Sequence, residues 1–232
     1  MLLSLIVPCY NESKNLNILV SKLDQNIKNK EIELIIVNNG SYDNSLDIIS
    51  NLLKKYNYIK LVNVQNNIGY GYGLYQGIIN AKGMFIGYTH ADLQTDPNDI
   101  FKIYELLTKE NTKTFFKGSR KKRNLYDKFF TKGMSLMSKF ILKQNLQDIN
   151  AQPTVFHHSF LKQVLDPPKD FSFDLYLYYT AIKNNYKIKR FPVFFHKRIY
   201  GEAHLKNLKS KIIYSLKTIK YIIWLKKNNN KL

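Results

Sequence analysis

The stretch YTHADLQTDP, residues 88–97, decides how the chain folds around it. It overlaps the end of an apolar segment, residues 84–89, that predicts a short buried strand, and Pro97 suits the first position of a helix. Asp92, Gln94 and Asp96 therefore fall in the turn between strand and helix. In an open α/β sheet such turns face the ligand crevice, where oxygen ligands suit a magnesium or manganese ion that carries a diphosphate. The alternative is a capped turn whose aspartates only satisfy helix N–H groups.

Two further apolar segments end in polar clusters of the same kind. Residues 2–7 run into PCYNES at residues 8–13, and residues 32–37 run into NNGSYD at residues 38–43. Alternation of apolar runs with amphipathic stretches indicates an α/β fold with a mostly parallel sheet flanked by helices. We expect strands over residues 2–8, 32–38, 59–64, 84–89 and 113–117, and helices over residues 12–28, 43–56, 71–82 and 97–108.

Six motifs follow one another in a fixed order along the chain. They are VPCYNES (7–13), IIVNNGSYD (35–43), NNIGYGYGLYQGIINAKG (66–83), HADLQTDP (90–97), GSR (118–120) and RIYGE (198–202). In this order they resemble family 2 glycosyltransferases, above all the dolichyl- or polyprenyl-phosphate mannose synthase branch, over nearly the whole chain. The resemblance implies a GT-A fold over residues 1–204, with a nucleotide-binding half at 1–118 and an acceptor half at 119–204. A basic amphipathic helix and tail at 205–232 would follow.

The resemblance also implies an activity. We expect an inverting, metal-dependent enzyme that moves a sugar from a nucleotide-sugar donor to a polyprenyl phosphate, with Mn²⁺ or Mg²⁺ as cofactor. One alternative is transfer to a hydroxyl of a surface glycan or of a lipid-linked oligosaccharide. Another is a non-catalytic module that binds nucleotide sugars or membranes, because Asn39 and His90 stand where the family usually carries aspartates.

On the donor side, the resemblance assigns five residues to the nucleoside. Pro8, Tyr10 and Glu12 line the pocket, and Asn39 and Asp43 stand where the family reads the base and braces the loop. Each of them alone could equally be a turn former or a cap. An amide at residue 39 offers a donor as well as an acceptor, so the identity of the base stays open.

The family's D-x-D motif corresponds to His90-Ala91-Asp92, which is followed by Gln94. The expected metal ligands are Asp92, Gln94 and His90, and His90 and Ala91 are also expected to contact the nucleotide sugar. Imidazole suits manganese better than magnesium, so His90 indicates a shifted metal preference, a direct contact with the nucleotide, or lost catalysis. Lost catalysis is the minor interpretation, because the other motif residues remain.

On the acceptor side, Asp148 and Asp174 are the two candidate catalytic carboxylates. Asp148 precedes the acceptor-site turn of the mannose synthase branch, whereas Asp174 stands where hydroxyl-transferring relatives place the general base. A phosphate acceptor is already ionised, whereas a sugar hydroxyl needs a positioned carboxylate. Arg198, in RIYGE, matches the family arginine whose planar fork meets phosphate, and Arg120 in GSR is assigned to the nucleotide sugar. The family's Ser-Lys is replaced by Ala203-His204, which leaves the acceptor open.

The charge of the chain is uneven. The net charge is +19, yet residues 1–100 carry eight Lys/Arg against nine Asp/Glu, and residues 101–232 carry 28 against eight. This asymmetry predicts a polyanionic partner for the second part: nucleic acid, an anionic membrane surface or a phosphorylated substrate. Nucleic acid is disfavoured, because the lysines accompany aliphatic stripes and no recognised nucleic-acid motif occurs.

Two segments combine a helical stripe of apolar residues with lysines. The segment 126–141 is typical of a core helix, and a wall of a groove for a lipid chain is the alternative. The segment 205–227 can lie on a membrane or pack on its own sheet; its longest apolar run, residues 221–225, is far shorter than the ~20 residues that cross a bilayer. Its stripe consists of Leu205, Leu208, Ile212, Leu216, Ile219 and Ile223.

The single cysteine, Cys9, excludes a disulfide framework and favours a reducing setting. The N-terminus begins with a strand pattern and carries no signal-peptide pattern. We therefore expect a cytoplasmic protein that is peripheral at the inner face of the membrane.

Overall fold

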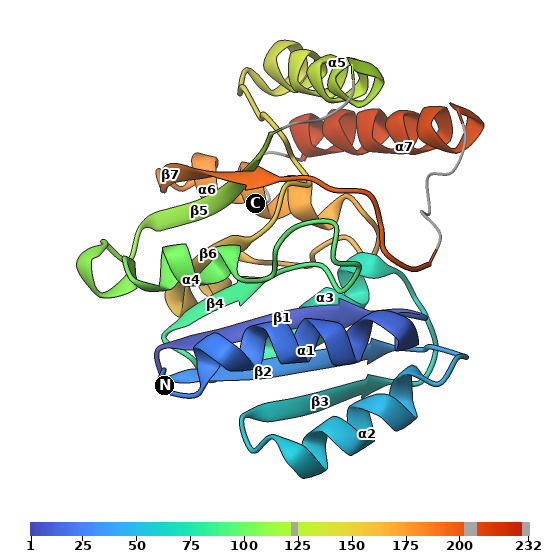
Figure 1. Cartoon of the computed structure of the whole chain (residues 1–232). Coiled ribbons are helices and arrows are strands. Elements are labelled where there is room, and N and C mark those ends of the chain that lie inside the picture. Colours follow the sequence, from blue (N-terminus) through green and yellow to red (C-terminus); the bar gives the residue numbers. More distant parts are fainter. Residues whose placement is uncertain (122–124, 202–207, 229–232) are drawn as a thin grey trace.

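One sheet of seven strands organises the molecule (Figure 1). The strands are β1 (Leu3–Cys9), β2 (Ile32–Asn39), β3 (Ile59–Val64), β4 (Phe85–Tyr88), β5 (Thr114–Lys121), β6 (Thr154–His157) and β7 (Lys187–Phe194). The computed structural model describes residues 1–121, 125–201 and 208–228. The strand order is β3-β2-β1-β4-β6-β5-β7, and only β6 runs antiparallel to its two neighbours. The mostly parallel α/β sheet expected from the sequence is thus confirmed.

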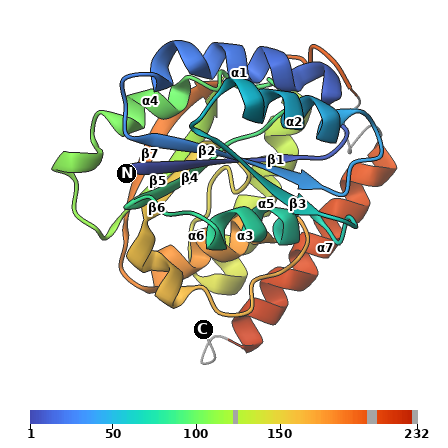
Figure 2. The same ribbon diagram turned by 90° about the horizontal axis from the view of Figure 1, so that it is seen from below.

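Helices cover both faces of this sheet (Figure 2). They are α1 (Ser13–Ile27), α2 (Ser45–Lys55), α3 (Tyr70–Ile79), α4 (Asp99–Tyr104), α5 (Leu125–Leu142), α6 (Phe173–Lys183) and α7 (Leu208–Lys227), with 3-10 turns η1 (Leu107–Lys109) and η2 (His158–Gln163). α1, α2 and α4 lie on one face, and α3 and α6 lie on the other, with α5 and α7 beyond them. Each face buries its own cluster of apolar side chains against the helices.

The central strands follow directly from their apolar runs. β2 is buried along its whole length, as expected of a strand with helices on both sides. The register pairs Ile6 of β1 with Ile35 of β2 and with Tyr88 of β4, so the carboxyl ends of these three strands meet at one edge of the sheet. That edge is where ligands bind in open α/β folds.

Two features differ from the expected elements. The helix expected over residues 97–108 is shorter, because Asp96 accepts a hydrogen bond from the Asn98 N–H (3.0 Å) and holds Pro97 in a turn before α4. The strands β6 and β7 were not predicted. β6 has only four residues, and β7 is a largely half-exposed strand that carries three basic residues, so neither has the apolar run of a buried strand.

The C-terminal helix α7 has two distinct sides. Ile222 and Leu225 are fully buried in the core cluster on the α3 and α6 face, while Leu216 and Ile223 of the predicted apolar stripe are exposed. α7 therefore belongs to the core and also presents an apolar outer side. α5 packs beside α7 (Figure 1). Leu205 lies outside the described residues, as do residues 122 and 123 of the basic run after Arg120. Among the described residues, none of the helices combines the length and apolar character needed to cross a bilayer.

Candidate active site

A cleft of about 550 Å³ opens at the edge where β1, β2 and β4 end. It gathers eleven of the thirteen predicted site residues: Pro8, Tyr10, Glu12, Asn39, His90, Ala91, Asp92, Gln94, Arg120, Asp174 and Arg198. They come from segments far apart in the sequence, and the sheet topology brings them together. Asp43 and Asp148 are the two predicted residues that do not line it.

Asp43 braces the loops behind the cleft. Its Oδ2 accepts a hydrogen bond from the Ser13 N–H (3.1 Å) and its Oδ1 accepts one from the Ser45 N–H (3.0 Å), so one carboxylate joins the starts of α1 and α2. Burial alone would raise the pKa of Asp43, but the hydrogen bonds from Ser45 and Ser13 outweigh it and lower the pKa. The Asp43 side chain therefore stabilises the loops that precede α1 and α2.

An arginine joins two carboxylates at the centre of the cleft. Arg198 Nη2 lies 2.9 Å from Asp92 Oδ2, and Nη1 lies 3.5 Å from Glu12 Oε1. Arg198 Nε also donates to Gln94 Oε1 at 3.4 Å. Burial raises the pKa of Glu12 above its usual value, and the Arg198 charge opposes that rise. The guanidinium thus neutralises a patch of carboxylates that would otherwise repel one another.

His90 also lines this cleft. Burial lowers its pKa; the nearby Asp92 charge opposes that shift, and Arg120 adds to it. A neutral ring retains a lone pair, which can coordinate a metal ion or accept a hydrogen bond.

The three expected metal ligands do not form a ready-made metal centre. In the part of the chain that the structure describes, no group of three or more His, Cys, Asp or Glu side chains is placed to hold a metal ion. Gln94 is engaged elsewhere, because its Nε2 donates to the His196 carbonyl (3.2 Å) and its Oε1 accepts from Arg198. Asp92 Oδ1 accepts a hydrogen bond from the Gln94 N–H (3.1 Å). Such a donor set fits a cation that arrives with phosphate oxygens of its own, as Mg²⁺ usually does.

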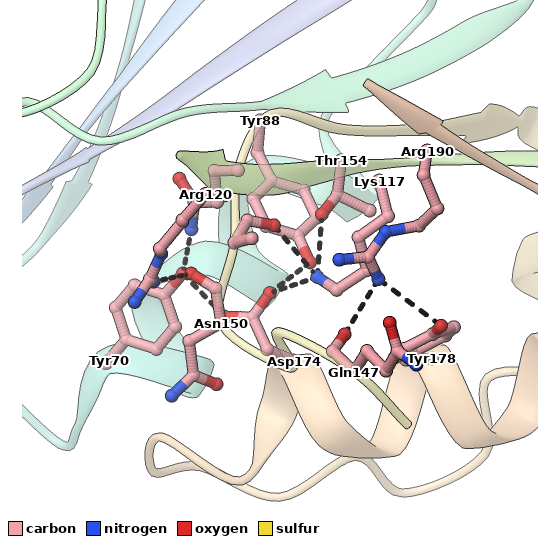
Figure 3. Close-up of polar contacts among 12 residues, drawn as sticks. Tyr70, Tyr88, Lys117, Arg120, Gln147, Asn150, Thr154, Asp174, Tyr178 and Arg190 are labelled. Carbon is pink, nitrogen blue, oxygen red and sulfur yellow. Dashed lines mark hydrogen bonds and ion pairs between the residues drawn. The ribbon is translucent and has the colours of Figure 1, made fainter. Parts of the chain in front are cut away.

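Asp174 sits at the start of α6, and its carboxylate contacts Tyr70, Tyr88 and Lys117 (Figure 3). Its Oδ1 accepts a hydrogen bond from Tyr88 (2.7 Å) and faces Lys117 Nζ at 3.4 Å. Its Oδ2 accepts one from Tyr70 (3.1 Å), whose hydroxyl in turn accepts from Gln152 Nε2 (2.6 Å). These partners hold Asp174 in a single orientation toward the cleft.

Lys117 is the partner that sequence reasoning missed. It extends from β5, is fully buried, and donates to the Ala151 carbonyl (3.1 Å) and to Thr154 Oγ1 (3.2 Å) as well as to Asp174. Burial lowers its pKa to about 8, although Asp174 favours the charged form. The available signal was a lysine inside the otherwise apolar start of a strand, Thr114-Phe115-Phe116-Lys117.

Asp148 lies beside the cleft and supports it from outside. Its Oδ2 accepts from the Arg120 N–H (3.2 Å) and lies 3.6 Å from Arg190 Nη2. The Arg120 side chain donates to the Asn150 carbonyl and lies over the Phe195 ring at 5.1 Å. Asp148 therefore fixes the strand that carries Arg120, whereas Asp174 is the carboxylate at the cleft itself.

An aromatic wall, formed by Tyr70, Phe171 and Tyr214, closes one side of the cleft. Tyr70 stacks on Phe171 (5.0 Å between ring centroids), and Phe171 and Tyr214 form a T-shaped pair with 5.8 Å between their ring centroids. Tyr214, from α7, accepts a hydrogen bond from Asn150 Nδ2. Sequence reasoning had placed α7 outside the acceptor half and so did not find this contact.

Comparisons with known proteins show what the chain is similar to. The family model described as Glycosyl transferase family 2 matches residues 4–166. The chain is 33% identical over 115 residues to dolichyl-phosphate beta-glucosyltransferase ALG5A of Trichomonas vaginalis, which covers 47% of the chain and 34% of that protein. It is 28% identical over 216 residues to dolichol-phosphate mannosyltransferase of Pyrococcus furiosus, covering 89% of the chain and 60% of that protein. The chain thus spans only part of these relatives.

A solved structure with the same fold is glucosyl-3-phosphoglycerate synthase from Mycobacterium tuberculosis. Its complex with Mn²⁺, uridine-diphosphate and glucosyl-3-phosphoglycerate has a TM-score of 0.71 at 12% identity, over 98% of this chain and 79% of that one. Its complex with Mg²⁺ and uridine-diphosphate has a TM-score of 0.72 at 13% identity, over 94% and 79%. At this level of identity the likeness establishes the GT-A fold.

Proposed function

Because the chain belongs to glycosyl transferase family 2, we propose that it transfers a sugar from a nucleotide-sugar donor to a polyprenyl phosphate. The carrying observation is the cleft at the strand ends, where Asp92, Asp174, Arg120 and Arg198 converge. The relatives named for dolichyl-phosphate glycosyl transfer support the lipid-phosphate acceptor.

The donor nucleoside occupies the side of the cleft formed by Pro8, Tyr10, Glu12 and Asn39 in this proposal. Asn39 Nδ2 donates to the Gly69 carbonyl (3.2 Å), while Asn39 Oδ1 is buried and has no hydrogen-bond partner among the residues that the structure describes. A buried acceptor without a partner is costly, so a ligand N–H is its natural complement. This supports the assignment of Asn39 to the base.

The diphosphate lies toward Asp92, with His90 and Ala91 beside it, and is accompanied by a divalent cation, Mn²⁺ or Mg²⁺. Asp92 would hold that cation together with phosphate oxygens of the donor, and His90 is the second candidate ligand. When bound, such a cation neutralises the charge that develops on the departing diphosphate. Arg120 supplies fixed positive charge on the same side.

Transfer forms a bond between an acceptor oxygen and the anomeric carbon while the bond from that carbon to the diphosphate breaks, with inversion. A phosphate acceptor brings an ionised oxygen and releases no proton in this step. Asp174 already accepts hydrogen bonds from Tyr70 and Tyr88 and faces Lys117, which supports a role as fixed anion at the acceptor side. Asp148 acts as a positioning residue through Arg120.

Transfer to a hydroxyl is the second candidate, because Asp174 does line the cleft. In that reaction Asp174 would take the hydroxyl proton through Oδ2. The two reactions make different demands on Asp174, and the double substitution described in the Discussion separates them.

We further propose that the chain docks on the cytoplasmic, anionic surface of a membrane. The outer side of α7 exposes Ile212, Leu216 and Ile223, and Lys217 and Lys220 on the same helix are also solvent-accessible. Exposed apolar side chains flanked by lysines suit an interfacial helix at anionic lipids. Docking would bring the cleft to a lipid-borne acceptor.

The direct test measures release of nucleoside diphosphate from a panel of nucleotide sugars, with polyprenyl phosphate and either Mn²⁺ or Mg²⁺. The proposed function requires release that depends on both the acceptor lipid and the cation. Release that is equal with a free sugar and with the lipid phosphate would contradict the acceptor assignment, and no release from any donor would contradict transferase activity.

A further inference from the structure

The glycine-rich stretch at the start of α3 packs directly against the loop that precedes α6. An added Cβ at Gly69 would lie 2.3 Å from the Lys169 carbonyl oxygen. One at Gly71 would lie 2.3 Å from the Pro168 carbonyl oxygen. The Tyr72 N–H also donates to the Lys169 carbonyl (3.0 Å). Backbone thus lies on backbone at a separation that requires glycine, and this contact fixes the position of the loop.

This loop presents one large apolar side chain to the cleft. Phe171 lines the cleft, and 39% of its surface is exposed. Its ring stacks on Tyr70 with 11° between the ring planes, and it forms a T-shaped pair with Tyr214 of α7 at 77°. Because the loop backbone is fixed and the ring is held between two others, the exposed surface of Phe171 is already formed. Such a surface inside a cleft suits an apolar group of a ligand.

One residue links this aromatic wall to a cationic side chain. Asn150 Nδ2 donates to the Tyr214 hydroxyl, and the Asn150 carbonyl accepts from the Arg120 side chain. Arg120, Tyr214 and Phe171 all line the cleft. A guanidinium suits phosphate oxygens, whereas an aromatic ring suits apolar carbon. The ligand that matches both is a phosphate ester whose phosphate is attached directly to an apolar group.

We propose that Phe171 selects the acceptor by binding the apolar group next to its phosphate, the first part of an isoprenoid chain. This inference rests on the proposed function, in which Asp174 stands at the acceptor side of the cleft. Tyr70 borders that side, because its hydroxyl donates to Asp174 Oδ2 (3.1 Å). An apolar group that contacts Phe171 leaves water at a gain in free energy, whereas a polar group loses hydrogen bonds to water that the ring does not replace.

The experiment is calorimetry of isopentenyl phosphate and glycerol phosphate binding to the full chain, without vesicles or detergent. The two esters are similar in size and carry the same phosphate, so the ratio of their dissociation constants reports the contact with the apolar group. Wild type should bind isopentenyl phosphate about tenfold more tightly. Phe171→Ser should reduce this preference to about twofold and leave the affinity for glycerol phosphate within about twofold of wild type. Phe171→Leu keeps an apolar side chain and should retain most of the preference.

The matched control is Phe194→Ser. Phe194 is the same residue type with a similar exposed fraction, 46%, and it lies at the end of β7 outside the residues that line the cleft. This variant should keep the wild-type preference, and thermal unfolding verifies that each variant is folded. An unchanged preference in Phe171→Ser would overturn the inference, as would an equal loss in Phe194→Ser.

Two results for wild type separate this inference from the proposed function. Binding of both esters without a preference would overturn the inference and leave a phosphate acceptor in place. Binding of neither ester would overturn the inference together with the phosphate acceptor. Weaker binding of a uridine-diphosphate sugar to Phe171→Ser, with the preference between the esters unchanged, would assign the ring to the transferred sugar and also overturn the inference.

Discussion

Lys117 of β5 and Asp174 of α6 form an ion pair, Nζ to Oδ1 3.4 Å, with side chains that are 0% and 3% exposed (Figure 3). Asp174 lines the cleft, and Tyr88 adds a hydrogen bond to the same carboxylate oxygen. Charges this deeply buried depend on each other for stability. Two predictions about the molecule follow from this one contact.

The first prediction concerns stability and pH. Lys117 has a pKa of about 8 in the folded chain, against a usual value of 10.5. Between these values the unfolded chain binds more protons than the folded chain, so the contribution of Lys117 to the free energy of unfolding rises with pH. The slope is at most about 1.4 kcal/mol per pH unit.

Urea unfolding between pH 7.5 and 10 measures this slope. Lys117→Met should lose it and should be about 3 kcal/mol less stable than wild type at pH 7, because Asp174 is left without its cation. Lys22→Met, an exposed lysine on α1, is the control and should follow the wild-type profile. A Lys117→Met profile parallel to that of wild type would refute the assignment.

The second prediction separates the two acceptor classes. Asp174→Asn alone leaves the buried Lys117 charge without its anionic partner. A loss of activity in that variant would therefore not distinguish lost catalysis from lost stability. The double variant Lys117→Met with Asp174→Asn removes both charges and retains an acceptor for the Tyr88 hydroxyl. With a phosphate acceptor we expect its turnover within about tenfold of wild type, whereas loss of a general base costs about 10²- to 10⁴-fold. The measurement is the turnover number for sugar transfer to polyprenyl phosphate, in a double variant shown to be folded. It distinguishes a fixed anion from a general base at Asp174.

The third prediction concerns the cation. Asp92→Asn should lower metal-dependent transfer at least about a hundredfold, because it removes the carboxylate nearest the departing diphosphate. Its unfolding midpoint should change little, since the amide still accepts from the Gln94 N–H and Arg198 keeps Glu12 as an anionic partner. Asp96→Asn is the matched control, since Asp96 lies in the same turn and is exposed. Comparable activities of the two variants would remove Asp92 from the mechanism.

The fourth prediction concerns the membrane. Truncation before α7 is a poor test, because it also removes the buried Ile222 and Leu225. Leu216→Ser changes only the exposed side, and it should reduce sedimentation with anionic liposomes several-fold while nucleotide binding stays constant.

Leu165→Ser is the control for this comparison. The residue type is the same and the exposed fractions are similar, 54% for Leu216 and 57% for Leu165. Liposome binding by wild type should also weaken as salt is raised. Equal effects of the two substitutions would place the contact surface elsewhere.

The parallel part of the fold was predictable because its strands are buried on both sides. Residues 59–64 form β3 with the bounds expected from the sequence, and the motif order correctly indicated the GT-A fold. β6 could not be predicted, because its four residues are stabilised by pairing with β4 and β5, which are distant in the chain. The local sequence pattern of residues 154–157 does not indicate that they pair with these strands.

The candidate site was predictable where residues follow strand ends. The positions of the motifs were sufficient to predict that Asp92, Glu12 and Arg198 line one cleft. Their mutual contacts depend on the loop that follows β7, which the motifs do not describe. Lys117 was missed because a lysine in a strand is usually turned to solvent. Tyr214 was missed because its role depends on how α7 packs, which an amphipathic pattern leaves undetermined. The roles of these residues in binding and transfer stay predictions.

Tyr214 and Leu216 are two residues apart on α7, yet the first lines the cleft and the second faces outward. A helix of 20 residues is stiff over this distance, so one side cannot shift without the other. A movement of the outer side of α7 would therefore also move Tyr214, which contacts Phe171 in the aromatic wall of the cleft. The exposed side of α7, proposed above as the membrane contact, and one wall of the cleft thus belong to the same helix.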